Sequence, residues 1–531
     1  MLGALDSWLL QLGAVICVVL AAWYLYFKIS YSYWEKRGIP TLKPKAPFGN
    51  FRDSILLGRN PGFEITELYK AFDGHRVGGV YRLSGPSLLL RDTEIIKDIL
   101  VKDFDHFFSR GRVVDEKYEP LDGHLFALSG TKWRNLRVKL TPVFTTLKIK
   151  MMFGTVIECG KELEHFLQEP ANNGETIEVK DILARYSTDI IASCAFGIQC
   201  NCLKNPDAEF RNWGRKVFEP HFRQRLTSIL NILYPSLVYT LKVSLIPKEV
   251  SNYFRKMVKE TVEYREKNNV ERNDFMQLMI QLKNKTLNVA EEEDVKTLQK
   301  ETDGLKSSNT PFEVTMDVIA AQAFVFFVAG FETSSTTMTF CLYELALNPD
   351  IQERLRSEIN TVLEKHGGNI TYESIFEMAY LDKVVNETLR KYPPLISLTR
   401  DCTKSIKLRG TDVTLEKGVQ VLLPVLGLHH DPKYYPDPER FDPERFSEEE
   451  KKKRPPFSFL PFGEGPRICI GMRFGLLQTK VGIISFLANY EVRVSERTTV
   501  PPVLDQRTFI LSTVGGMWLK IVNRHNKSNS I

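Results

Sequence analysis

Closely spaced cysteines are almost absent from this chain of 531 residues. The eight cysteines stand at positions 17, 159, 194, 200, 202, 341, 402 and 469, so only Cys200 and Cys202 are near neighbours. A disulfide framework, a zinc site or an iron–sulfur site needs several cysteines at short spacings, and this distribution argues against all three. It is typical of a protein in a reducing compartment.

A strong excess of charge is also absent. The net charge is +6 and the isoelectric point is near 8.7. The sequence has no organised stripe of basic and aromatic residues of the kind that nucleic-acid-binding domains carry, so it predicts no nucleic-acid partner. What the chain has in quantity is apolar side chains, 43% of its residues, which supply the core of one large domain or of several.

The first long apolar run, residues 7–27, contains no charged side chain. About 20 such residues span a bilayer as a helix, so we expect a transmembrane anchor after a short lumenal N-terminus, residues 1–6. Asp6 before the run and aromatic residues such as Trp23 and Tyr26 near its end do not fit a cleaved signal peptide, and the aromatics suit a membrane interface. A buried core helix is the alternative.

Positive charge follows the run at Lys28, Lys36 and Arg37, and the positive-inside rule then places the rest of the chain in the cytosol. Residues 28–50 also contain three prolines, which oppose helix formation and stiffen the chain. We therefore expect a basic, Pro-rich linker over residues 28–50 and a large folded domain over residues 51–531.

The segment FGEGPRICIG, residues 462–471, holds Cys469 in a glycine-rich turn, with Arg467 two residues before it and an apolar helical pattern after Gly471. A nearby cation and a helix N-terminus both stabilise a thiolate. The pattern therefore indicates a single thiolate ligand for an iron. A buried structural cysteine is the alternative, whereas a dinucleotide-binding loop would need a third glycine that this segment lacks.

The same segment resembles the haem-binding loop of the cytochrome P-450 superfamily, F-x-x-G-x-R-x-C-x-G, at every fixed position. The resemblance implies that the cofactor is haem b, that Cys469 is the axial ligand of its iron, and that the thiolate favours cleavage of the O–O bond. It also implies that Phe462 lies beside the haem and that Arg467 binds a haem propionate.

Residues 313–346 form a helical pattern that is apolar almost all round, which predicts a central, buried helix. Within it, Gly330 indicates a loosened turn or a close neighbour. A threonine bonded to its own backbone beside an exposed glutamate would explain Thr333 and Glu332. However, the segment AGFETS resembles the oxygen-activation motif of the same family, which implies room for dioxygen at Gly330 and a catalytic role for Thr333 and Glu332 in proton delivery.

Glu387 and Arg390 lie one helical turn apart and resemble the E-x-x-R pair of this family. Alone, such a pair is usually a surface salt bridge. The family adds an arginine from a later P-E-R-F segment, and of the two copies in this chain the second, which contains Arg445, has the usual flanks. The resemblance implies a buried, structural network of these three residues.

Trp133 and Arg137 lie four residues apart and so share one helix face. They resemble the W-x-x-x-R motif of the family, in which the indole N–H and the guanidinium bind haem propionates. Arg110 is a further propionate ligand by the same resemblance. Without the other motifs, an amphipathic surface helix would be the better interpretation.

The resemblance runs from about residue 38 to the end of the chain and is strongest to the insect microsomal family-6 type. It implies a mainly α fold with a small β-rich lobe, which is the cytochrome P-450 fold after an N-terminal transmembrane helix, and it makes residues 51–531 the haem-thiolate catalytic domain. Apolar and β-branched residues predict strands within residues 78–92 and a hairpin within residues 508–522. The polar segment 283–311 predicts a mobile surface loop.

The implied activity is that of a haem-thiolate monooxygenase, which inserts one oxygen atom from dioxygen into a lipophilic substrate. Electrons from NADPH would arrive through a separate flavoprotein reductase, with cytochrome b5 as a second candidate donor. The protein would lie in the endoplasmic reticulum membrane, with its catalytic domain on the cytosolic side. A haem-thiolate isomerase or dehydratase that needs no dioxygen and a non-catalytic haem protein are the alternatives.

The implied substrate pocket is apolar and aromatic, which suits xenobiotics such as plant allelochemicals or insecticides, or endogenous lipids. Its lining is expected at Phe324, Phe327, Val328, Leu395, Ile396 and Ile510. Basic residues flank the segments around the thiolate and would attract an acidic reductase, with an ordinary solvated side chain as the alternative for any single one. They are Lys132, Arg134, Lys139, Lys148, Lys150, residues 451–454, Arg473 and Lys480.

Overall fold

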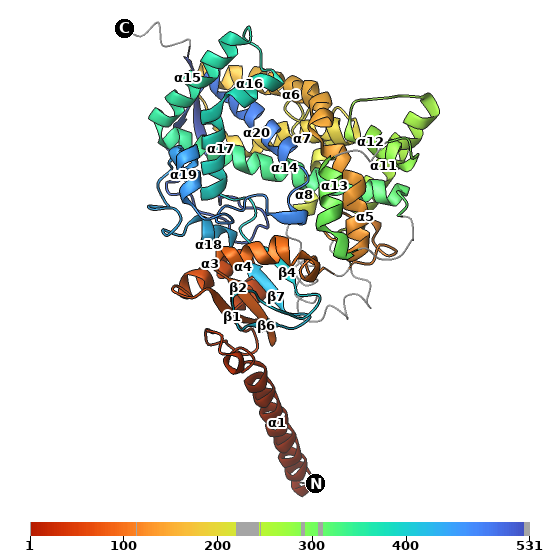
Figure 1. Ribbon diagram of the computed structural model, residues 1–531, viewed down its shortest axis with the longest axis vertical. Coiled ribbons are helices and arrows are strands. Elements are labelled where there is room, and N and C mark those ends of the chain that lie inside the picture. Colours follow the sequence, from red (N-terminus) through yellow and green to blue (C-terminus); the bar gives the residue numbers. More distant parts are fainter. Residues whose placement is uncertain are drawn as a thin grey trace.

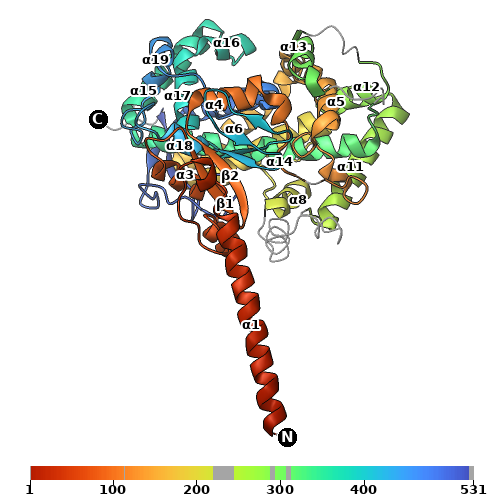
Figure 2. The same ribbon diagram turned by 60° about the horizontal axis from the view of Figure 1, so that its bottom comes forward.

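The computed structural model describes residues 2–112, 114–218, 244, 246–287, 293–305 and 312–524. One long helix, α1 (Leu2–Ser30), projects from a body of packed helices, and a small sheet lies where α1 joins the body (Figure 1 and Figure 2). The mainly α fold with a small β-rich lobe after an N-terminal apolar helix is confirmed.

Helix α14 (Met316–Leu347) runs through the centre of the body (Figure 2) and confirms the helix expected from the apolar pattern at 313–346. Thr315 Oγ1 caps it by accepting a hydrogen bond from Val318 N. Neighbouring helices on several sides explain why its sequence is apolar almost all round. They are α7 (Val179–Ile191), α11 (Lys248–Asn268), α17 (Ala379–Lys391) and α20 (Met472–Leu487).

The other helices of the body wrap around this centre. In chain order, the described ones are α2 (Arg52–Leu57), α3 (Pro61–Ala71), α4 (Thr93–Lys97), α5 (Gly130–Leu140), α6 (Thr146–Asn173), α8 (Glu209–Phe218), α12 (Phe275–Lys283), α13 (Glu293–Glu301), α15 (Pro349–Lys365), α16 (Tyr372–Glu377), α18 (Val425–His429) and α19 (Glu448–Lys453).

The β lobe is built on a four-stranded sheet in the order β1-β2-β7-β4. Strands β1 (Val77–Arg82) and β2 (Gly85–Leu90) pair antiparallel and confirm the strands expected within residues 78–92. Strand β7 (Gln420–Leu423) pairs parallel to β2 and antiparallel to β4 (Leu398–Asp401). Distant parts of the chain therefore meet in this lobe, which has a hydrophobic core of its own.

The hairpin expected within residues 508–522 is wrong. Strand β9 (Trp518–Asn523) lies between β3 (Thr176–Glu178) and β8 (Tyr490–Val494), and Thr513 forms only an isolated bridge with Leu504. The alternation of apolar residues identified the strand itself, but the partners come from elsewhere in the chain, so local pattern could not identify them. A third, two-stranded sheet pairs β5 (Ile406–Lys407) with β6 (Thr414–Leu415).

The loop expected over residues 283–311 is wrong for residues 293–301, which form α13. Val295 and Leu298 are three residues apart on one face of that helix and are buried, with 1% and 6% of their surface exposed. Two apolar residues in a polar segment are enough for a short helix that packs on a neighbour. Residues 288–292 and 306–311 of the expected loop lie outside the described residues.

Among the described residues, two helices are long and apolar enough to cross a membrane. One is α14, at the centre of the body, and the other is the N-terminal stretch Leu10–Arg37, whose most apolar part is exposed. The chain that follows α1 is packed rather than loose. Trp34 is fully buried, donates from Nε1 to Val80 O at 3.1 Å, and lies so close to Gly79 that a side chain there would collide with its ring.

Candidate active site

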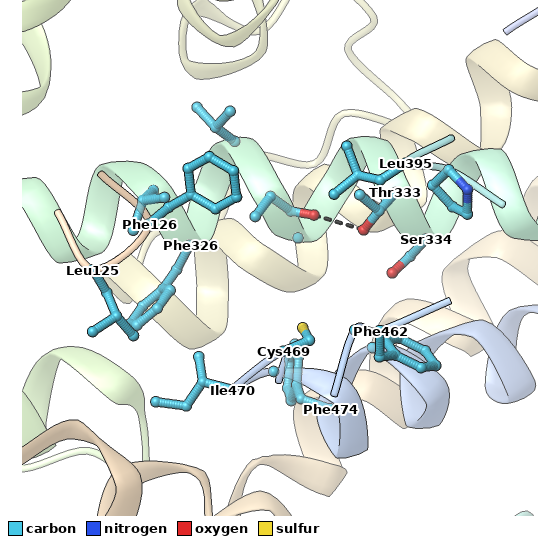
Figure 3. Close-up of a pocket in the computed structure, with 18 of the residues that line it drawn as sticks. Leu125, Phe126, Phe326, Thr333, Ser334, Leu395, Phe462, Cys469, Ile470 and Phe474 are labelled. Atoms are coloured by element: carbon cyan, nitrogen blue, oxygen red, sulfur yellow. Dashed lines mark hydrogen bonds between the residues drawn. The ribbon is translucent and has the colours of Figure 1, made fainter. Parts of the chain in front are cut away.

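A cavity of about 620 Å³ lies between α14 and the loop that leads into α20 (Figure 3). Cys469 on that loop and Thr333 on α14 face the cavity from opposite sides. Most of the wall is apolar or aromatic. Residues of this kind labelled in Figure 3 are Leu125, Phe126, Phe326, Leu395, Phe462, Ile470 and Phe474.

Glycines determine the course of the Cys469 loop. Gly463 and Gly465 have φ values of 71° and 70°, a conformation that side chains disfavour. A Cβ atom at Gly465 would also collide with the carbonyl of Leu100. The loop is closed by a hydrogen bond of 2.9 Å from Cys469 N to Phe462 O, and α20 begins three residues after the cysteine.

The thiol of Cys469 lies inside the body of the protein, and its exposed surface faces the cavity. Burial raises its pKa, while the backbone N–H of Gly471 and the positive charges of Arg137 and Arg110 act in the opposite direction. The stabilisation of a thiolate by a nearby N–H and by cations is therefore present. The cations are Arg137 and Arg110, whereas Arg467, expected from the sequence, is turned away into bonds with backbone carbonyls.

Among the arginines that line the cavity, Arg137, Arg400 and Arg467 are buried and Arg110 is half-buried. Burial lowers the pKa of each, to about 10 for Arg137 and Arg400. The Nε atoms of Arg137 and Arg400 are buried with no hydrogen-bond partner among the described residues. Asp122 is the one carboxylate among the residues that line the cavity.

The remaining donors of these arginines hold the surrounding loops together. Arg467 donates to Phe108 O at 3.0 Å and to Leu128 O at 2.7 Å, and its guanidinium lies 4.2 Å from the ring centre of Trp133. Arg110 donates to Phe126 O at 3.1 Å. Buried cations with unbonded N–H groups call for anionic partners. The two propionates of haem b fit this need, because the cavity offers several guanidinium groups beside the thiol.

Sequence reasoning missed Arg400, which projects from β4. No local motif surrounds it, and it reaches the cavity only because β4 pairs with β7 inside the sheet. The four residues that were expected at the propionates all lie in the cavity wall. They are Arg110, Trp133, Arg137 and Arg467.

The turn of α14 that faces Cys469 is braced from two sides. A Cβ atom at Gly330 would lie 2.6 Å from Ile191 Cδ1 of α7, so the glycine has a close neighbour, one of the two interpretations that its position in a helix left open. Gln478 of α20 donates from Nε2 to Gly330 O at 2.8 Å and also bonds Ser334 Oγ. Thr333 lines the cavity, and its hydroxyl donates to Ala329 O at 2.7 Å.

Glu332 lies away from the cavity wall and forms an ion pair of 2.8 Å with Lys180 Nζ of α7. Both side chains are 19% exposed. Lys180 also donates to Ser335 Oγ at 2.9 Å and Thr336 Oγ1 at 2.8 Å. Glu332 is thus the partner of a lysine that sequence reasoning did not single out.

Of the six residues expected to line a substrate pocket, the structure brings four to the cavity wall. These are Phe324, Val328, Leu395 and Ile510. Phe327 instead packs on Phe210 and Phe254, and Ile396 packs against Gly62. Phe326 and Phe126 line the cavity but were not anticipated. A helix that is apolar all round gives no sign of which face borders a cavity.

Glu387 and Arg390 of α17 are fully buried and joined by two hydrogen bonds of 2.7 and 2.8 Å. Arg445 Nε lies 3.4 Å from Glu387 Oε1, so the three residues form one network. His429, which was not anticipated, connects this network to the Cys469 loop, since its Nδ1 contacts Arg390 O at 3.2 Å and its Nε2 accepts a hydrogen bond of 2.8 Å from Leu460 N.

A haem-thiolate protein is the class that this fold and site define, and the comparisons with known proteins agree. The family model for cytochrome P450 matches residues 40–519, so the chain belongs to the cytochrome P450 family. Among its relatives, cytochrome P450 6k1 of Blattella germanica is 44% identical, with 96% of each chain covered. Probable cytochrome P450 6a14 of Drosophila melanogaster is 42% identical over 96% of this chain and 98% of its own, and cytochrome P450 6a2 of the same fly is 40% identical over 94% and 96%.

The resemblance to the insect family-6 type is therefore confirmed, and the protein is a cytochrome P450 monooxygenase. Membership of the family implies a haem held by a cysteine thiolate, a separate redox partner and lipophilic substrates. The exposed N-terminal apolar helix makes it a membrane-anchored member.

Proposed function

We propose that this chain binds haem b in the 620 Å³ cavity, with Cys469 as the axial ligand of the iron. The observation that carries the proposal is that the thiol borders the same apolar cavity as three buried arginines and the half-buried Arg110. Two of the buried arginines, Arg137 and Arg400, have an unbonded Nε. A bound haem supplies the chemistry that activates dioxygen. Cys469 would be kept from water by the aromatic wall, and the Gly471 N–H would stabilise its thiolate form.

The two propionates would be held by Trp133 and by four arginines, Arg110, Arg137, Arg400 and Arg467. Phe462 would contact the porphyrin ring. Support comes from the cost of burying these guanidinium groups, which an anion offsets through charge-assisted hydrogen bonds. The backbone carbonyls that Arg467 and Arg110 already bond would fix the positions of both side chains.

Thr333 and Glu332 would take part in proton delivery. The Thr333 hydroxyl borders the cavity and can rotate from its bond with Ala329 O to hold a water molecule there. The ion pair of Glu332 with Lys180 is partly exposed. It would exchange protons with solvent, at the end of the proton route that lies away from the cavity. The hydroxyls of Ser335 and Thr336, which accept hydrogen bonds from Lys180, keep that lysine in place.

The substrates would be lipophilic molecules such as xenobiotics, among them plant allelochemicals and insecticides, or endogenous lipids. The apolar cavity supports this class. Electrons from NADPH would come from a flavoprotein reductase, with cytochrome b5 as a second candidate donor.

The protein would be anchored in the endoplasmic reticulum membrane with residues 1–6 in the lumen and residues 7–27 in the bilayer. Residues 28–50 would connect the anchor to a cytosolic catalytic domain, residues 51–531. The basic residues that follow the apolar run support this orientation.

The test is the carbon monoxide difference spectrum of the reduced protein. The wild-type protein should show the Soret band of a thiolate-ligated haem, and Cys469→Ser should lose it. Cys402→Ser is the matched control, because Cys402 lies in the β lobe and bonds Lys404 O rather than facing the cavity. Folded, haem-loaded wild-type protein without the thiolate band would contradict the proposal.

A further inference from the structure

Helix α13 lies against α5, the helix of Trp133 and Arg137 (Figure 1 and Figure 2). Buried apolar side chains and a hydrogen bond hold α13 in this position. Val295 and Leu298 are buried on its inner face, and Thr131 Oγ1 of α5 bonds Leu305 O, just beyond the helix, at 3.4 Å. The segment 293–305 therefore forms part of the surface on the thiolate side of the molecule.

An ion pair connects this segment to the start of α20. Arg473 Nη1 lies 3.0 Å from Asp294 Oδ2, and both side chains are 49% exposed. Arg473 stands four residues after Cys469, so it is an exposed cation close to the shortest route from the surface to the thiolate. Nevertheless, Asp294 of the same chain compensates the positive charge of Arg473.

Arg134 of α5 is engaged by the same segment. Its Nε donates to Thr302 O and Thr302 Oγ1, both at 3.0 Å, and its Nη2 donates to Gln299 O at 3.5 Å. By contrast, Lys139 and Lys148 form no ion pair with any described residue. The segment 293–305 thus engages two of the cations that would attract an acidic partner, Arg473 and Arg134. Carboxylates elsewhere in the chain pair with three more, namely Lys132, Lys150 and Lys480.

The outer face of the segment 293–305 places acidic side chains beside the basic residues around Arg473 and Arg134. Glu293, Asp294, Glu301 and Asp303 are all exposed, against two exposed lysines, Lys296 and Lys300. An acidic protein that approaches this surface would meet like charge, and like charges at an interface slow encounter and weaken binding.

We propose that α13 is an acidic cover over the face where electrons arrive, and that it competes with the redox partner for Arg473 and Arg134. The inference rests on the proposed function, in which an acidic flavoprotein reductase docks near Cys469. Docking of the reductase replaces Asp294 at Arg473 with a carboxylate of the partner, so the internal ion pair sets the strength of the complex.

The experiment measures NADPH-dependent turnover of the full-length protein in phospholipid vesicles as the concentration of full-length reductase is varied. Asp294→Asn should lower the apparent KM for the reductase by about two- to fivefold at low ionic strength, because an exposed ion pair is worth little more than that. The difference should shrink as sodium chloride is added. Glu293→Gln removes the same charge one residue away without breaking the pair, and it should change the KM less.

Arg473→Gln completes a double-mutant cycle. If Asp294 masks Arg473, the arginine substitution should raise the KM for the reductase more in the Asp294→Asn background than in the wild type. Val295→Asp places a charge at a buried position and should detach α13, which should lower the KM at least as much as Asp294→Asn. An unchanged or raised KM in both Asp294→Asn and Val295→Asp, or a cycle with no coupling, would overturn the inference.

Turnover supported by an organic hydroperoxide separates this inference from the proposed function, because it needs no reductase. All variants should match the wild type in that assay and in the carbon monoxide spectrum. Loss of hydroperoxide turnover in the wild type would count against the monooxygenase site itself. Normal hydroperoxide turnover with a KM for the reductase that does not respond to Asp294 would count against α13 alone.

Discussion

Gly330 has to leave space on two sides, toward the cavity and toward Ile191 of α7. A glycine costs about 1 kcal/mol in a helix interior relative to alanine, so at an open position the alanine variant would gain stability. Here the added methyl would lie 2.6 Å from Ile191 Cδ1, and a packed neighbour must move. Close packing therefore outweighs helix propensity at this residue.

We expect Gly330→Ala to lower the free energy of unfolding by about 1 kcal/mol, because overpacking of 1–3 kcal/mol exceeds the gain in helix propensity. Gly154→Ala in α6 is the matched control, since nothing lies within 4 Å of the added methyl, and it should be neutral or stabilising. The double variant Ile191→Val with Gly330→Ala should recover stability. Equal denaturation midpoints for both glycine variants would contradict this account.

A second prediction concerns the Thr333 hydroxyl, which borders the cavity. Thr333→Ala should reduce the fraction of NADPH consumption that yields product and should increase hydrogen peroxide release, because the proton route loses its last hydroxyl. Thr333→Ser should keep most of the coupling. Thr339→Ala, which removes a buried hydroxyl bonded to Ser335 O on the same helix, serves as the control. Unchanged coupling in Thr333→Ala would exclude the relay role.

At the scale of elements, α17 and the Cys469 loop are joined by a buried polar network. Glu387 and Arg390 are fully buried, and His429 carries the connection to Leu460. The network fixes where the loop begins, and the glycines fix its course. A defect in α17 should therefore shift the position of the Cys469 loop.

Arg390→Met should lower the free energy of unfolding by about 3–5 kcal/mol, because it leaves the Glu387 carboxylate buried without its main partner. The purified variant should also retain less haem. Lys453→Gln breaks an exposed ion pair with Glu450 and should change stability by less than about 1 kcal/mol. Denaturant unfolding of both variants, followed by haem absorbance, distinguishes the two cases.

The elements also mark how far sequence reasoning reaches. Helix α14, strands β1 and β2, and the turn before α20 follow from local patterns, because periodicity and glycine placement are local properties. The partners of β9, the position of Arg400 and the helix α13 depend on contacts with distant segments. The same limit explains why Phe327 was expected at the cavity and Phe326 was not, since adjacent residues of an all-apolar helix differ only in what packs against them.

At the scale of the whole molecule, two buried histidines couple stability to pH. Burial lowers the pKa of both His124 and His429 from 6.5 to about 3. Each therefore binds a proton more readily in the unfolded chain, so its contribution is fully present above pH 6.5 and is lost as the pH falls toward 3. Burial raises the pKa of Asp122 from 3.8 to about 6. Asp122 therefore binds a proton more readily in the folded protein, and its contribution to stability increases as the pH falls from about 6 to 3.8.

We therefore expect the free energy of unfolding to fall below pH 6.5, with each histidine contributing up to about 1.4 kcal/mol per pH unit. His429→Gln should be less stable at neutral pH because hydrogen bonds are lost, yet its stability should depend less steeply on pH. His75→Gln, at an exposed position, is the control. A wild-type stability that is level from pH 6.5 to 4 would contradict the prediction.

A final prediction concerns the junction of anchor and body. Removal of residues 1–27 should leave a folded, haem-binding protein that membranes hold less tightly, because Trp34 and its bond to Val80 O remain. Removal of residues 1–36 also deletes Trp34, a large buried side chain, and should destabilise the β lobe by about 3–5 kcal/mol. Thermal unfolding and sedimentation with vesicles measure the two effects separately.

The packing of Trp34 against β1 has a consequence for how this enzyme meets other proteins. A body held to its anchor in this way would keep one tilt relative to a bilayer, so its remaining motions would be sliding within the plane and rotation about the membrane normal. A partner held in the same plane then has fewer orientations to search. The rotational entropy that two freely tumbling proteins lose on association is in part already lost here.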